Sequence, residues 1–180
     1  MNLPNRLTIS RIIMIPFFVV FLITGIGGAY SKWIALAIFV TASLTDLLDG
    51  KIARKYNLVT NFGKFMDPLA DKLLVCSAMI CLTGMDRLPS WIVCIIIARE
   101  FIISGFRLIA SDNGVVIAAS MWCKVKTVFQ MAMVILLIAD LPGNAFRIAE
   151  NVLIWAALIL TVVSLADYIL KNKDVLKDKE

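Results

Sequence analysis

The sequence reads DLLDGKIAR over residues 46–54 and GKFMDPLAD over residues 63–71, and both stretches lie within largely apolar segments. The two aspartates of the first stretch are three residues apart, and those of the second are four apart. On a helix, either spacing places both side chains on one face. Each pair is therefore expected to point at a shared position. The four residues are Asp46, Asp49, Asp67 and Asp71.

The composition is that of a membrane protein, because 61% of the 180 residues are hydrophobic and only 17% are charged. A helical span needs roughly 20 mainly apolar residues, so this length holds about six spans and no separate soluble domain. The chain contains no histidine, which excludes an imidazole base, a Ser-His-Asp triad and histidine-rich metal sites. Acid, base and metal chemistry must then fall to carboxylates. The four cysteines lack CxxC spacing and are interpreted as small buried hydrophobes.

The apolar runs, separated by turn-forming residues, predict an all-α integral membrane protein that forms one domain over residues 1–180. A short interfacial helix is expected over residues 1–5, ahead of the first span. No cleavable signal peptide is evident, so the N-terminus is expected to be retained. The six expected spans are residues 7–23, 33–53, 65–83, 91–110, 121–139 and 148–170.

Lysine and arginine are unevenly distributed between the two sides of this arrangement. One side receives only Lys32, Arg87 and Arg147, whereas the other receives the remaining lysines and arginines of the loops, span ends and C-terminal tail. The positive-inside rule makes the basic side cytoplasmic, and six spans place both termini there. Trp33 and Trp91 would lie at the opposite interface. The net charge of +5 is interpreted as this membrane bias, and no nucleic-acid partner is expected.

Spans two and three are antiparallel neighbours, so the two aspartate pairs are expected at one membrane depth. Four converging carboxylates would repel one another unless a cation compensated them. Oxygen-only ligands select hard ions, Mg²⁺ or Mn²⁺ with Ca²⁺ as a further candidate, and two such ions could hold a pyrophosphate for phosphoryl-group transfer. Gly50 and Ala53 leave a shallow floor near these aspartates, and Arg54 is placed for a phosphate. The alternative, interhelical ion pairs with close helix packing, leaves four acids with too few nearby bases.

The spacing of eight residues over positions 46–71 resembles, without a departure, the signature of the CDP-alcohol phosphotransferase family. The resemblance implies a six-helix homodimer with a cavity open to the cytoplasmic side. It also implies that Asp46, Asp49 and Asp67 bind metal, and that Asp71 lies near the second metal and acts as general base. The nucleotide and pyrophosphate site implied by it comprises Gly50, Ala53 and Arg54. In that mechanism the acceptor alkoxide attacks the lipid-side phosphorus of CDP-diacylglycerol and CMP leaves.

Four further cations indicate the acceptor alcohol. Arg99 lies about 12 Å along span four from Trp91, where an arginine is costly unless it faces a polar cavity. Arg107 follows two turns later, and Lys124 and Lys126 open span five on the same side. Together they could bind an acceptor that carries its own phosphate. The alternative is that Arg99 only pairs with Glu100 and that the lysines only set topology.

Motifs outside the signature resemble the phosphatidylglycerophosphate synthase branch of the family. They are NLPNRLTISR over residues 2–11, REFIISGFR over residues 99–107 and KVKTVFQ over residues 124–130. Cys123 is a departure, because that branch commonly has glycine there. The resemblance adds Thr8 to the binding residues and implies glycerol 3-phosphate as acceptor, in a bacterial plasma membrane. The alternatives are phosphatidylinositol-phosphate synthase, another enzyme of the family, or a divalent-cation transporter, although no broken helices or repeated halves are evident.

Overall fold

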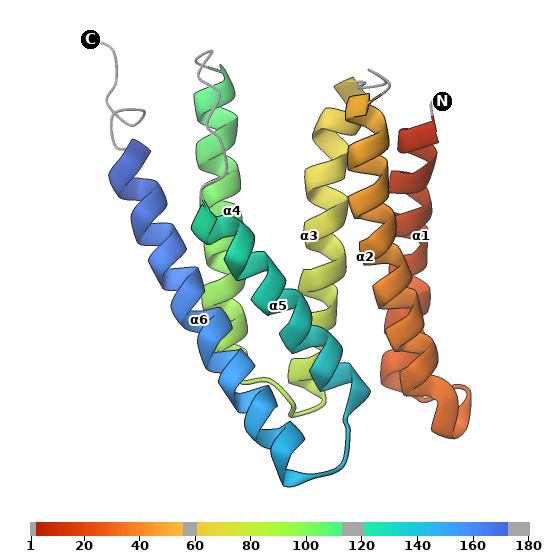
Figure 1. Ribbon diagram of the computed structural model, residues 1–180. Helices are drawn as coiled ribbons and strands as arrows, with labels where there is room; N and C mark the ends of the chain where they lie inside the picture. Colours follow the sequence, from red (N-terminus) through yellow and green to blue (C-terminus); the bar gives the residue numbers. More distant parts are fainter. Residues whose placement is uncertain (1–2, 56–60, 113–120, 173–180) are drawn as a thin grey trace. The chain divides into compact units, whose positions relative to one another are not determined.

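The computed structural model describes the backbone of residues 3–55, 61–112 and 121–172. Side chains are described over the same ranges except at residues 3–6, 46–55, 61–68, 71, 108–109 and 111–112. All the regular secondary structure in these ranges is helical, and they contain no strand (Figure 1). Gly28–Tyr30 is a short 3-10 helix, η1. The six α-helices are α1 (Leu3–Thr24), α2 (Ser31–Lys55), α3 (Asn61–Gly84), α4 (Ser90–Asp112), α5 (Met121–Ala139) and α6 (Asn144–Asn172).

Each segment that the sequence predicts as a span is helical, and α5 has the expected bounds. The prediction of a separate interfacial helix over residues 1–5 was wrong, because α1 runs without a break from Leu3. Pro4 lies in the first turn of α1, where a backbone N–H would have no partner within the helix. This proline therefore begins the helix instead of dividing it.

Three helical segments are long and apolar enough to cross a membrane, within the part of the chain that the structure describes. They are residues 7–24 of α1, the whole of α5 and the whole of α6. The other helices also carry charged residues: α2 and α3 hold the four aspartates, and α4 includes Arg99, Glu100 and Arg107. Charged residues in a membrane helix commonly face a polar interior and mark functional sites.

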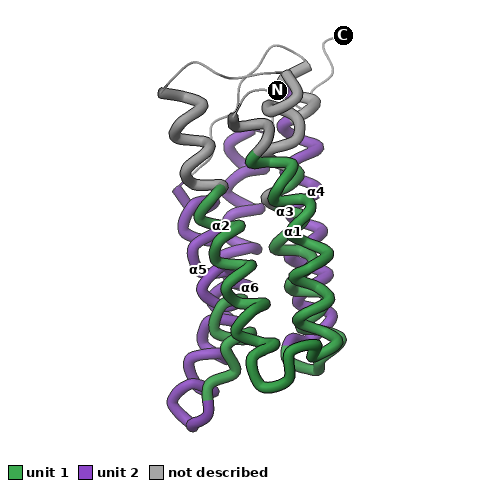
Figure 2. The backbone as a smooth tube through the Cα atoms, turned by 90° about the vertical axis from the view of Figure 1, so that its right-hand side faces the viewer, with its two compact units in different colours: residues 1–87, 134–141 green, residues 88–133, 142–180 purple. Residues whose placement is uncertain are grey.

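The chain divides into two compact units, shown in different colours in Figure 2. Unit 1 comprises residues 1–87 and 134–141, and its helix α1 packs against both α2 and α3. Phe18 of α1 and Phe39 of α2 are fully buried, with ring centroids 5.8 Å apart. Small buried residues let the backbones approach closely. They are Ala35, Ala42, Ala70 and Ala78.

At one end of unit 1, three residues that are distant in sequence meet. The carboxylate of Asp140 forms an ion pair with Arg87, and Lys32 Nζ donates a hydrogen bond to the Asp140 carbonyl oxygen at 3.2 Å. We name this group the Asp140 clamp. The sequence places Lys32 and Arg87 on the same side of the membrane, and in unit 1 they lie at the same end.

The Asp140 clamp yields a prediction about stability. Asp140 has φ 44°, in the left-handed region that aspartate and asparagine tolerate better than alanine. Asp140→Ala loses the ion pair and adds backbone strain, so we expect a loss of about 1–2 kcal/mol, measured as a lower melting temperature in detergent. Asp140→Asn keeps the backbone preference and should lose less. Equal losses in the two variants would contradict the role of the backbone.

Unit 2 comprises residues 88–133 and 142–180, and within it α4 packs against α6. Ile103 and Phe106 of α4 form a buried cluster with Tyr168 of α6. The rings of Trp91 and Trp155 pack against each other further along these helices, with centroids 6.1 Å apart. Unit 2 is therefore held by aromatic contacts at two levels along α4 and α6.

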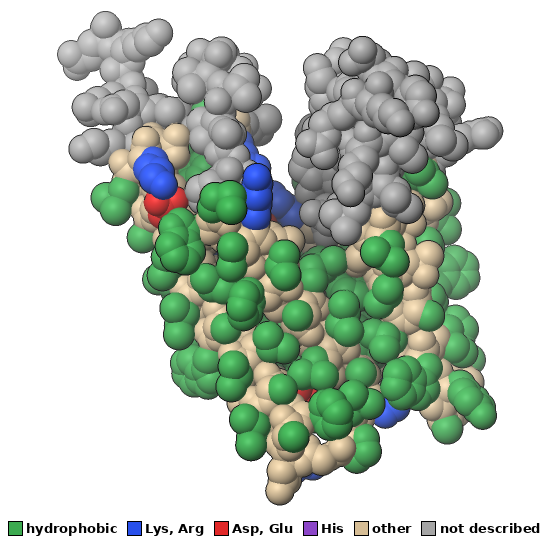
Figure 3. Space-filling view, in the orientation of Figure 1, with side chains coloured by type: hydrophobic (Ala, Val, Ile, Leu, Met, Phe, Trp, Pro, Cys, Tyr) green, Lys and Arg blue, Asp and Glu red, His purple; other side chains and the backbone are tan. Residues whose placement is uncertain are grey.

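Apolar side chains cover much of the visible surface of the described residues (Figure 3). Phe17, Phe101 and Val128 are 58%, 66% and 67% exposed. Exposed apolar surface on this scale is unfavourable in water and suits contact with lipid. The surface agrees with the membrane character indicated by the composition.

Candidate active site

The two aspartate pairs occupy matching levels in unit 1. Measured from the helix ends joined by the Asp140 clamp, the helical rise places Asp46 about 22 Å along α2 and Asp71 about 20 Å along α3. Asp49 and Asp67 follow at about 27 Å and 26 Å. Two consecutive helices therefore carry the aspartate pairs at the same distance from a common end.

α1 adds two buried polar residues at this level. The Ser31 hydroxyl donates a hydrogen bond to the Phe21 carbonyl oxygen, so the end of α1 lies beside the start of α2. From Thr24, the rise places Arg11 about 20 Å and Thr8 about 24 Å back along α1. Both side chains are at most 1% exposed. A buried guanidinium needs compensating groups, so this level of unit 1 is polar inside.

The side chains of the seven signature residues named above lie outside those that the structure describes, so their helix positions are known but not their contacts. They are Asp46, Asp49, Gly50, Ala53, Arg54, Asp67 and Asp71. Among the side chains that are described, no group of three or more histidine, cysteine or acidic residues could hold a metal ion. At the level where α2 and α3 both carry aspartates, the available metal ligands are carboxylate oxygens, which suit a hard divalent cation.

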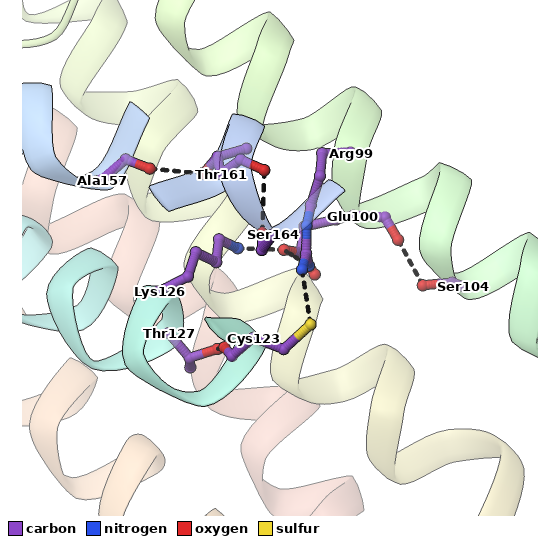
Figure 4. Close-up of polar contacts among 9 residues, drawn as sticks. All are labelled: Arg99, Glu100, Ser104, Cys123, Lys126, Thr127, Ala157, Thr161 and Ser164. Atoms are coloured by element: carbon purple, nitrogen blue, oxygen red, sulfur yellow. Dashed lines mark hydrogen bonds and ion pairs between the residues drawn. The ribbon is translucent and has the colours of Figure 1, made fainter. Parts of the chain in front are cut away.

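In unit 2, one carboxylate joins two of the predicted binding cations (Figure 4). Glu100 accepts a hydrogen bond from Arg99 Nη1 at 3.0 Å and forms a second ion pair with Lys126 of α5. Arg99 and Lys126 are only 5% and 2% exposed. These three residues, the Glu100 cluster, hold two positive charges against one negative charge. The pairing of Arg99 with Glu100 is present, yet it leaves the cluster cationic.

Cys123 occupies the position at which the sequence departs from its family branch. Its buried sulfur accepts a hydrogen bond from Arg99 Nη2 at 3.0 Å (Figure 4). Cysteine sulfur is a weak hydrogen-bond acceptor, and here it helps to orient the guanidinium. α5 is continuous through this position. The cysteine thus fits the local helix packing and contacts a predicted site residue.

The two other predicted cations have different surroundings. The guanidinium carbon of Arg107 lies 5.9 Å from the centroid of the Tyr168 ring. Arg107 is half-buried, has no ion pair among the described residues, and its Nε is buried there without a hydrogen-bond partner. Lys124 is exposed. The structure therefore brings Arg99 and Lys126 together and places Arg107 on an aromatic ring instead.

Comparison with known proteins agrees with these features. The family model for CDP-alcohol phosphatidyltransferase matches residues 1–163. The chain belongs to this family. Its signature aspartates thus lie in the matched region, as do all the cations of the Glu100 cluster and Arg107.

Several relatives of the chain carry names that refer to phosphatidylglycerophosphate synthesis. A protein of Bacillus subtilis named CDP-diacylglycerol–glycerol-3-phosphate 3-phosphatidyltransferase is 44% identical over 98% of this chain and 97% of its own length. A protein of Haemophilus influenzae with the same name is 39% identical over 98% and 96%. A probable phosphatidylglycerophosphate synthase of Mycobacterium tuberculosis is 41% identical over 93% of this chain and 80% of its own length.

Sequence reasoning missed the contacts that two polar residues of unit 2 make with the predicted binding cations. Glu100 entered only as a possible partner of Arg99, whereas it also binds Lys126. Tyr168 was not selected, although it is 1% exposed and lies beside Arg107. An acidic residue in an apolar run is a signal that could have drawn attention to Glu100. A tyrosine near the end of an apolar helix is too common to have done so for Tyr168.

Proposed function

We propose that this chain is a phosphatidylglycerophosphate synthase, which transfers the phosphatidyl group of CDP-diacylglycerol to glycerol 3-phosphate and releases CMP. The observation that carries the proposal is the matching level of the two aspartate pairs on α2 and α3, in a chain that belongs to the CDP-alcohol phosphatidyltransferase family. The names of the relatives from Bacillus subtilis and Haemophilus influenzae support glycerol 3-phosphate as the acceptor.

Each signature residue has a role in this proposal. Asp46, Asp49 and Asp67 would hold divalent metal, Mg²⁺ or Mn²⁺ and two ions in number, and Asp71 would belong to the same site. When bound, the ions supply positive charge that offsets the carboxylates and the pyrophosphate. Gly50, Ala53 and Arg54 receive the nucleotide and pyrophosphate of CDP-diacylglycerol, with Thr8 beside them on α1.

Asp71 acts as the general base. Its carboxylate takes the proton of the acceptor hydroxyl. The acceptor oxygen that has lost this proton forms a bond to the lipid-side phosphorus of CDP-diacylglycerol. The bond from that phosphorus to the CMP oxygen breaks, and CMP leaves with the electron pair. The position of Asp71, one helical turn from Asp67, would allow it to serve both the acceptor and the metal site.

The cations of unit 2 bind the phosphate of the acceptor. Arg107 carries a full positive charge with no ion pair among the described residues, which suits it to an incoming anion. Arg99 and Lys126 are oriented by Glu100 and add one net positive charge. Lys124 is exposed and adds to the positive field of unit 2. A dianionic acceptor would gain from this excess of positive charge, whereas serine or choline would not.

The proposal also covers the membrane arrangement. All six helices span the plasma membrane as one domain, both termini are cytoplasmic, and the site opens to the cytoplasmic side, where soluble glycerol 3-phosphate is available. The charge bias along the sequence and the polar level shared by α1, α2 and α3 support this orientation. The active form is a homodimer, as the family resemblance implies.

The direct test is CMP release from CDP-diacylglycerol by the purified protein, with glycerol 3-phosphate, inositol phosphate and serine compared as acceptors. We expect release with glycerol 3-phosphate and little with the other two. A preference for inositol phosphate would assign the chain to the runner-up activity. Release with serine, or no release with any acceptor, would contradict the proposed anion site.

Arg107→Ala should raise the KM for glycerol 3-phosphate by about 10- to 100-fold and leave the KM for CDP-diacylglycerol nearly unchanged. The reason is that the change removes a charge-assisted contact to the acceptor phosphate alone. Steady-state kinetics with each substrate varied in turn would measure both constants.

Arg99→Ala provides the comparison. It should raise the same KM, but it should also lower the melting temperature, because Glu100 loses a buried partner. Lys32→Ala is a control on the clamp side of unit 1 and should leave both KM values unchanged. If Arg107→Ala changed the two KM values equally, Arg107 would have a structural role instead.

A further inference from the structure

The ring of Tyr168 packs against other side chains, but its buried hydroxyl has no hydrogen-bond partner among the described residues. It is 1% exposed, and its ring meets Phe106 edge-on, with centroids 5.7 Å apart at 84°. A buried tyrosine hydroxyl normally has a hydrogen-bond partner. The Tyr168 hydroxyl is buried and has none among the described residues. Phenylalanine would fill the same space without this unsatisfied group.

A second unsatisfied donor belongs to the arginine that lies against the ring of Tyr168. The Arg107 guanidinium carbon is 5.9 Å from the centroid of the Tyr168 ring, and Arg107 Nε is also buried without a partner within the described chain. The acidic residue adjacent in sequence, Asp167, pairs with Lys171 at 2.6 Å. The Arg107 side chain of α4 therefore lies against the Tyr168 ring of α6, and no carboxylate is bonded to Arg107 Nε or to the Tyr168 hydroxyl among the described residues.

The chemistry of these donors defines what could satisfy both. Arg107 Nε can only donate, and it belongs to a permanent cation. A ligand that accepts from both groups needs several lone pairs and a negative charge. A phosphate monoester has three terminal oxygens and meets both requirements. The face of the Tyr168 ring meanwhile favours a cation near it, which helps to keep the guanidinium in place before the ligand arrives.

We infer that Tyr168 is a further binding residue of the acceptor site, whose ring positions Arg107 and whose hydroxyl donates a hydrogen bond to the phosphate of the acceptor. This inference rests on the proposed function, because the ligand is the phosphate of glycerol 3-phosphate. It adds to that function a residue of α6, the last helix of the chain, and a polar group that recognises the acceptor beyond the four cations.

The test is Tyr168→Phe, which removes the hydroxyl and keeps the ring. We expect the KM for glycerol 3-phosphate to rise on the order of tenfold, the loss typical of one hydrogen bond to a charged group. The KM for CDP-diacylglycerol should stay within about twofold, since only the acceptor loses a contact. The melting temperature without substrate should be unchanged or higher, because a buried hydroxyl without a partner is removed.

Tyr30→Phe is the matched control, because Tyr30 is 73% exposed in unit 1 and should show no change in either KM. Tyr168→Leu removes the ring as well, so its KM for glycerol 3-phosphate should exceed that of Tyr168→Phe. If Tyr168→Leu does not fold, Tyr168→Phe alone still decides. A Tyr168→Phe enzyme with wild-type KM for glycerol 3-phosphate, or with a lowered melting temperature and equal rises in both KM values, would overturn the inference.

The wild-type enzyme separates this inference from the proposed function. If the wild type fails to use glycerol 3-phosphate, the proposed function is wrong whatever the variants do. If the wild type uses it and Tyr168→Phe behaves like Tyr30→Phe, the proposed function stands and the inference about Tyr168 fails. A thermal shift with glycerol 3-phosphate, without CDP-diacylglycerol, should be smaller in Tyr168→Phe than in the wild type and gives a readout independent of turnover.

Discussion

Replacing Asp71 with asparagine is expected to lower kcat by about 10²- to 10⁴-fold, the usual contribution of a general base. Asparagine keeps the size of the side chain and removes both the basic lone pair and one negative charge. Binding of CDP-diacylglycerol should largely survive, because the proposed nucleotide residues Gly50, Ala53 and Arg54 are unchanged. Single-turnover CMP release at saturating substrates would measure the chemical step.

Two other aspartate variants serve as comparisons for Asp71→Asn. Asp46→Asn should weaken metal and nucleotide binding together, since Asp46 is proposed only as a ligand. Asp86→Asn is the matched control, because Asp86 is exposed beyond the end of α3 and its φ of 57° suits asparagine. If higher Mg²⁺ restored the activity of Asp71→Asn, Asp71 would be a ligand and the base would lie elsewhere.

The helices could be predicted from the sequence because each is a long apolar run ended by a strong local signal. α1 ends at Thr24, and Gly25 and Gly27 follow with φ of 65° and 114°, which suit glycine. The expected bounds of α5 were confirmed at Met121 and Ala139. Helix ends depend on local signals of this kind, so sequence reasoning reaches them. α1 starts four residues earlier than expected because proline is compatible with a first helical turn.

Part of the candidate site could likewise be predicted from the sequence, and part of it could not. Positions within α2 and α3 follow from sequence spacing and helical rise, so the level of the aspartate pairs could be anticipated. Contacts between helices that are distant in sequence could not. Lys126 lies 26 residues from Glu100, and their ion pair depends on how α5 is rotated against α4. The same holds for Arg107 and Tyr168, whose contact depends on how α4 packs against α6.

Removal of divalent metal is expected to lower the rate of CMP release by at least about three orders of magnitude. Added Mg²⁺ or Mn²⁺ should restore the rate. The physical reason is charge. The chain contains no histidine that could bind metal or carry positive charge beside the four carboxylates of α2 and α3. A bound pyrophosphate would add further negative charge at the same level. The measurement is turnover in excess chelator, followed by titration with each metal. Full activity in chelator would contradict the metal site.

A second readout, which needs no turnover, separates a metal site from a general salt effect. A ligand present at about 100 times its dissociation constant stabilises the folded protein by about 2.7 kcal/mol, so Mg²⁺ should raise the melting temperature of the wild type by several degrees. Asp46→Asn should lose most of this shift, because it removes one ligand and one negative charge. Asp86→Asn removes the same charge elsewhere and should keep the shift. Equal shifts in both variants would show that Mg²⁺ acts through ionic strength, and the carboxylates of α2 and α3 would then need another partner.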